Sequence, residues 1–216
     1  MKRNKTHYIS GKNTKKVPKQ NIIFHEAAHA TAIYFNNKTR NLPAVFFQIM
    51  INDIKSEQEE NSAVSRTVDP GYAAKIKGGR LIQSFLPPDD VTDDYMAAFE
   101  ADIVNLLVGP LAEAKYVHEY DDEFFNRGLV NISALNNYGG GLDLALVNEY
   151  LQSLYPGKQE QDEKFHPLFT AAIDFVEDHN YWQAIHQLAN YIYASNKSII
   201  GFEEVNSILE PLNLRN

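Results

Sequence analysis

Hydrophobic residues recur with a helical period near the start of the chain, and they predict a helix over residues 18–36. Ile22, Ala28 and Ala32 fall on one face of this helix. Pro18 suits its first turn, where a missing N–H costs nothing. Because most of the residues around that face are small, we expect a buried helix that packs closely against its neighbours.

Two apolar runs lack the helical period and predict strands. The first, AVFFQIMI, covers residues 44–51 and is rich in β-branched and aromatic residues. The second, RLIQSFL, covers residues 80–86 and follows a Gly-Gly pair that is typical of a turn. The polar stretch 55–69 between them predicts an exposed loop.

The rest of the chain is mostly helical in pattern. Gly109-Pro110 marks a place where the first of these helices is expected to bend or divide. The predicted helices cover 92–119, 142–154, 160–178, 181–195 and 202–210, with a loop at 120–141. The pattern predicts one mainly α-helical α+β domain with a small sheet over residues 18–212, preceded by a basic arm at 1–17.

Composition narrows the chemistry that the chain can perform. Its 216 residues include no cysteine, which excludes disulfides, thiolate metal sites and a cysteine nucleophile. A metal site must therefore use His, Asp, Glu or water. The chain has no uninterrupted run of about 20 apolar residues and no apolar segment behind its basic start. We therefore expect a cytoplasmic protein without a membrane span.

Charge is distributed unevenly along the chain. The first twenty residues carry seven lysines and arginines and no acid, which leaves 13 basic against 28 acidic residues in the remainder. The arm contains none of the interleaved aromatic residues or modules that recognise nucleic acid. We expect it to be a solvated tail beside an acidic body, and we expect no nucleic-acid partner.

One motif in the first helix carries chemistry. His25-Glu26-Ala27-Ala28-His29 is H-E-x-x-H, and residues four apart lie on one face of a helix. Two imidazoles at that spacing can share a tetrahedral Zn²⁺, with Glu26 beside it as general base. The motif predicts a zinc-dependent metallopeptidase that hydrolyses peptide bonds with a metal-activated water.

The residues alone leave the third ligand open. Glu113, in the helical stretch 110–114, stands where a thermolysin-like enzyme would supply a glutamate. A metzincin would place a histidine six residues after His29, but Phe35 occupies that position. Asp143 follows a glycine-rich loop, although an aspartate in the first turn of a helix usually serves to cap it.

Several blocks of sequence then suggest a relationship. They are HEAAHA at 25–30, GGRLIQSFLPPDD at 78–90, LLVGPLAEA at 106–114, YGGGLDLALV at 138–147, and the tail at 182–209. In this order they resemble the peptidase domain of the FtsH family of ATP-dependent zinc proteases. HEAAHA is similar to that family's HEAGHA, LLVGPLAEA to LLGGRAAEE, and YGGGLDLALV to the loop and helix that carry TGASNDL. The resemblance covers roughly residues 20 to 210.

The resemblance implies roles for residues that local patterns leave open. It implies that Asp143 is the third zinc ligand and that Glu113 orients a ligand histidine. It also implies that an edge of the strand predicted at 80–86 binds an extended peptide. The expected substrate is a flexible or unfolded polypeptide.

The chain departs from the family in ways that limit this expectation. It contains no P-loop, ATPase module or membrane anchor, Ala28 replaces the family's glycine, and Pro110 replaces its arginine. The resemblance thus implies neither ATP-driven unfolding nor a hexamer, and the sequence leaves the oligomeric state open. An ATPase or adaptor that delivered substrate would be a separate chain.

Two other functions fit the same residues. One is a catalytically silent, peptidase-like protein that binds or regulates its targets, and the other is a purely structural metal site. The remaining histidines outside the arm show no ligand spacing and are expected at or near the surface; they are His118, His166, His179 and His186.

Overall fold

The computed structural model describes residues 20–51, 74–83 and 91–212. Helices form most of it, and three short antiparallel strands form one sheet, which confirms the mainly helical α+β class. The helices are α1 (Gln20–Thr39), α2 (Asp93–Tyr120), α3 (Ile132–Leu135), α4 (Gly141–Leu154), α5 (Lys158–Glu177), α6 (His179–Ala194) and α7 (Phe202–Leu209), with 3₁₀ turns η2 (Asn136–Tyr138) and η3 (Glu210–Leu212). The strands are β1 (Phe47–Ile51), β2 (Ala74–Gly78) and β3 (Ile199–Gly201).

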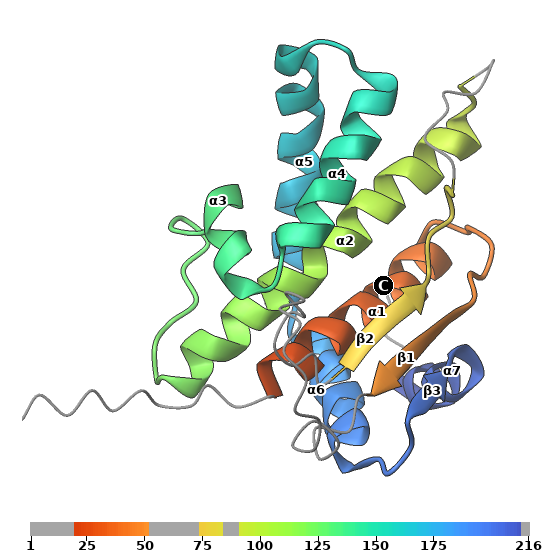
Figure 1. Ribbon diagram of the computed structural model, residues 1–216, viewed down its shortest axis with the longest axis vertical. Helices are drawn as coiled ribbons and strands as arrows, with labels where there is room; N and C mark the ends of the chain where they lie inside the picture. Colours follow the sequence, from red (N-terminus) through yellow and green to blue (C-terminus); the bar gives the residue numbers. More distant parts are fainter. Residues whose placement is uncertain (1–19, 52–73, 84–90, 213–216) are drawn as a thin grey trace, which may run out of the picture.

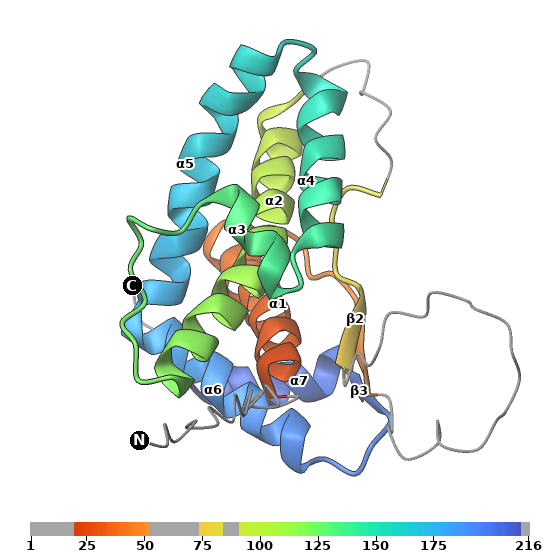
Figure 2. The ribbon, with the colours of Figure 1, turned by 60° about the vertical axis from the view of Figure 1, so that its left-hand side comes forward.

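Helices α1 and α2 pack side by side at the centre, and the other elements are arranged around them (Figure 1). Helix α6 packs against α1, whereas α4 and α5 pack against α2 (Figure 2). The sheet lies along α1 through β2. Thirteen of the twenty residues of α1 are buried, as its small side chains predicted. Other elements therefore cover most of this helix, and His25, Glu26 and His29 lie inside the protein.

Helix α2 is a single helix from Asp93 to Tyr120, although Pro110 lies within it. Thr92 caps its start by accepting a hydrogen bond from Tyr95 N at 3.2 Å. Of the two expectations for Gly109-Pro110, a bend or a division, the division is therefore wrong. Length and composition would allow α2 to span a membrane, but 72% of its most apolar window is buried inside the protein. This helix is apolar because it packs against α1, α4 and α5.

The sheet has the order β2-β1-β3, and its edge strand β2 lies along α1. Ile49 of β1 pairs with Ile76 of β2 and with Ile200 of β3. The strand predicted at 80–86 is wrong: β2 ends at Gly78, and residues 80–83 form no strand. Residues 84–86 of that prediction, and the loop predicted at 55–69, lie outside the described residues.

Two features explain why the chain leaves the sheet after β2. Gly78 and Gly79 have φ angles of +89° and +86°, which turn the backbone away. The N–H groups of Leu81 and Ile82 then donate to the Asp102 carboxylate of α2 at 2.9 and 2.8 Å. Ile82 is buried and Leu81 is half-buried, and the Asp102 side chain accepts the hydrogen bonds that a neighbouring strand would otherwise accept.

Candidate metal centre

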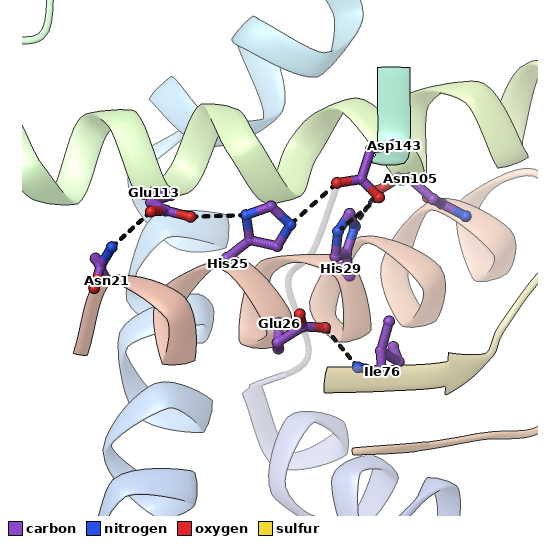
Figure 3. A network of polar contacts seen from close by, with 8 residues as sticks. All are labelled: Asn21, His25, Glu26, His29, Ile76, Asn105, Glu113 and Asp143. Atoms are coloured by element: carbon purple, nitrogen blue, oxygen red, sulfur yellow. Dashed lines mark hydrogen bonds and ion pairs between the residues drawn. The ribbon is translucent and has the colours of Figure 1, made fainter. Parts of the chain in front are cut away.

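Two histidines on α1 face α2 and the start of α4 (Figure 3). His25 and His29 are only 6% and 4% exposed, and their ring centroids lie 4.7 Å apart. One helical turn separates them, so their side chains leave the same face of α1. The H-E-x-x-H spacing therefore places two imidazoles side by side in the interior, where an unpaired polar group would be costly.

Asp143 approaches both rings from the first turn of α4. Its Oδ2 lies 3.2 Å from His25 Nε2, and its Oδ1 lies 3.5 Å from His29 Nε2. The three residues can each offer one ligand atom, and these atoms lie within 4.8 Å of one another. Tetrahedral Zn²⁺ with ligands at about 2.0–2.2 Å separates its ligand atoms by about 3.3–3.6 Å. The three donors and their spacing therefore fit Zn²⁺, although His25 and Asp143 are 118 residues apart in the sequence.

The second nitrogen of each ring also has a partner. His25 Nδ1 lies 2.9 Å from Glu113 Oε2, and Asn21 Nδ2 donates to Glu113 Oε1 at 2.6 Å. His29 Nδ1 lies 2.7 Å from the carbonyl oxygen of Asn105. These contacts fix both rings with Nε2 toward Asp143, as partners of metal-bound histidines commonly do.

Glu113 therefore lies on the far side of His25 from Asp143, and it is not in the three-residue group. Its position agrees with a role in orienting His25, and the geometry does not favour it as the third ligand. Sequence reasoning missed Asn21 and Asn105. Asn105 lies two helical turns before Glu113 on α2, so it shares the face toward α1, but it contacts His29 through its backbone carbonyl, which a side-chain pattern does not identify.

Proton affinities at the site reflect this crowding of acids and imidazoles. Burial lowers the pKa of His25, but its hydrogen bonds with Asp143 and Glu113 outweigh that effect and raise the pKa to about 10. Burial would raise the pKa of Asp143, yet the charges of His29 and His25 hold it below its ordinary value. The site thus stabilises positive charge at the point where the three side chains meet.

Glu26 lies next to this group without belonging to it. Its side chain is buried, and its Oε2 accepts a hydrogen bond from the N–H of Ile76 in β2 at 2.6 Å. Burial raises the pKa of Glu26, although nearby His25 and His29 counteract it. A cleft of about 310 Å³ opens beside it, and its lining includes His25, Glu26, His29, Asp143, residues 75–78, Arg80, Leu106, Gly139, Leu142 and Leu146.

Two glycines make room for the imidazole rings. A Cβ on Gly109 of α2 would lie 2.3 Å from His29 Nε2. A Cβ on Gly139 would lie 2.9 Å from Glu113 Oε2 and 3.2 Å from His25 Nδ1, and its φ of +71° also favours glycine. The elements that carry Glu113 and Asp143 can therefore approach α1 closely only because these two positions lack side chains.

We predict that Glu113→Gln weakens zinc binding about 10- to 100-fold without unfolding the protein. Glutamine keeps the size of the side chain but removes the negative charge beside His25 Nδ1, which makes the ring a weaker donor to a cation. Competition with a chromophoric chelator would measure the affinity. Glu119→Gln is a matched control on the same helix, because Glu119 is exposed and 3.8 Å from His186. Equal affinities for both variants would contradict this role.

Comparisons of the chain with models of protein families, with curated proteins and with solved structures found no match. The functional evidence is therefore the motif and the geometry of its residues. Within the part of the chain that the structure describes, two buried histidines and one half-buried aspartate form one group that is suited to a metal ion.

Proposed function

We propose that this protein is a zinc-dependent endopeptidase that cuts flexible or unfolded polypeptides. The observation that carries the proposal is the convergence of His25, His29 and Asp143 beside a buried glutamate on an open cleft. These three side chains would hold Zn²⁺, which when bound would polarise the peptide carbonyl and lower the pKa of a water molecule. Their imidazole and carboxylate donors are those that catalytic zinc sites use.

Glu26 is the proposed general base and acid. It accepts a proton from the attacking water and then delivers that proton to the leaving amine. A raised pKa suits both steps, because the carboxyl group must gain and lose a proton near neutral pH. The N–H of Ile76 holds Oε2, which fixes the carboxylate in the cleft.

The edge of β2 that faces away from β1 is the proposed site for the peptide backbone. Hydrogen-bonded pairs alternate along antiparallel strands. Gly79 N donates to the carbonyl oxygen of Phe46, the residue before β1, at 3.1 Å. With the register of β1 and β2, this alternation directs the backbone groups of Ile76 and Gly78 away from β1. The bond from Ile76 N to Glu26 agrees with that direction. An extended peptide on this edge would lie next to Glu26.

The resemblance to FtsH peptidases supports the same proposal, and we extend it to an FtsH-like peptidase fold. The family's third ligand corresponds to Asp143, which here approaches both histidines. An extended peptide is also the form of substrate that an edge strand can bind. We propose a cytoplasmic enzyme that uses no ATP itself. A separate ATPase or adaptor would have to deliver folded targets to it.

Zinc content and digestion of casein together test this proposal. The wild-type protein is expected to hold one zinc per chain, to digest casein, to lose both properties after chelation, and to regain both with zinc. Asp143→Ala is expected to hold no zinc at concentrations that saturate the wild type. Failure to bind zinc, or digestion that survives chelation, would overturn the proposal. Zinc binding without digestion would instead favour the silent binding or regulatory protein.

A further inference from the structure

The cleft has a cationic wall although the protein as a whole is acidic. The chain has a formal net charge of −8. Lys75, Lys77 and Arg80 all line the cleft, whereas the acids among its described lining residues are Glu26 and Asp143. Both acids already have roles as the base and as a metal ligand in the proposed function. Positive charge at this wall therefore favours a negatively charged substrate, although the protein as a whole is itself negative.

Strand geometry separates the two lysines from the interior. Successive side chains of a strand point to opposite faces, so Lys75 and Lys77 share the face opposite Ile76. Ile76 is on the inner side of the sheet, where its cross-strand partner Ile49 is fully buried. Both lysines are exposed on the outer face. Arg80 is half-buried, and its charge acts on buried Asp102, whereas the two lysines are more exposed to solvent.

Apolar residues line the opposite side of the same cleft. Leu106 of α2 and Leu142 and Leu146 of α4 contribute to the lining, and Leu142 is 58% exposed. A large apolar side chain that stays exposed beside a cleft is a typical contact for a ligand. A peptide on the β2 edge would therefore meet two different surfaces. Its inward side chains would face the leucines, and its outward side chains would face the lysines.

We propose that the site prefers peptides in which, near the bond that is cut, one apolar residue stands between two acidic residues. This proposal rests on the proposed peptidase and on the β2 edge as its binding site. A peptide strand beside β2 would place alternate side chains about 4.5–5.5 Å from those of Lys75 and Lys77. Those positions take aspartate or glutamate, and the intervening side chain points inward to the leucines.

Three fluorogenic peptides that share an apolar centre and carry glutamate, glutamine or lysine on both sides would test the preference. The wild-type protein is expected to cut the glutamate peptide about three- to tenfold faster than the glutamine peptide, and the lysine peptide slowest. The double variant Lys75→Glu/Lys77→Glu is expected to reverse this order. Lys158→Glu is the matched control, because Lys158 is exposed on α5 and pairs with Asp162. The preference is expected to shrink with added salt.

A binding measurement separates this inference from the proposed chemistry. Fluorescence anisotropy of the same peptides on zinc-loaded Glu26→Gln protein is expected to give the same order of affinities. Equal cleavage and equal binding of the three peptides would overturn the substrate preference and leave the peptidase intact. If no peptide is cut but the glutamate peptide binds best, the proposed peptidase activity is wrong and the proposed preference of the cleft for acidic peptides is supported.

Discussion

Glu26→Gln is expected to bind zinc as tightly as the wild-type protein and to digest casein about 10²- to 10⁴-fold more slowly. Glu26 is not in the group of His25, His29 and Asp143, so its loss leaves the proposed ligands in place. Glutamine can still accept the hydrogen bond from Ile76 N through its carbonyl oxygen. It cannot take a proton from water at neutral pH, and proton transfer is the step that should fail.

Zinc titration and digestion rates of the same protein samples would measure the two effects separately. Glu100→Gln is a suitable control, because Glu100 pairs with Arg40 at 3.1 Å and does not line the cleft. Digestion by Glu26→Gln at the wild-type rate would show that another group moves the proton. Loss of zinc from Glu26→Gln would show that this carboxylate holds the metal, contrary to the assignment of Asp143.

The helices were the predictable part of the fold. Residues 18–36 were expected to form the first helix, and α1 covers Gln20–Thr39, because a 3.6-residue period with small residues leaves little alternative. The strands were less predictable. β2 has the sequence AKIKG, in which lysines occupy the exposed face of a five-residue edge strand. β3 has only three residues. Their pairing depends on partners distant in sequence, which local patterns do not contain.

The site shows the same division between local and distant information. His25 and His29 could be recognised because one helical turn fixes their relation. Asp143 could not be chosen from its surroundings, because an aspartate in a first helical turn has an ordinary role there. Only the resemblance favoured it. The hydrogen bond from Ile76 N to Glu26, and the contact of His29 with the Asn105 carbonyl, involve backbone atoms, and no side-chain pattern identifies them.

Gly109→Ala should both destabilise the protein and weaken zinc binding, although alanine is the better helix former. In an unobstructed helix interior, this change would stabilise by about 1 kcal/mol. Here the added methyl would lie 2.3 Å from His29 Nε2 and 2.4 Å from Cε1, much closer than van der Waals contact. Overpacking of this kind costs about 1–3 kcal/mol.

The ring cannot give way without breaking its contact with Asn105 O at 2.7 Å, and that movement also carries Nε2 away from Asp143. We therefore expect a net loss of up to about 2 kcal/mol in the free energy of unfolding and a zinc affinity reduced about 100-fold. Denaturant titration and chelator competition would measure these quantities. Gly157→Ala is the control, since a Cβ there meets only Glu160 Oε2, at 3.4 Å. A Gly109→Ala protein that gained stability and kept its zinc would show that α2 does not press against His29, and the proposed metal site would lose the close packing that positions it.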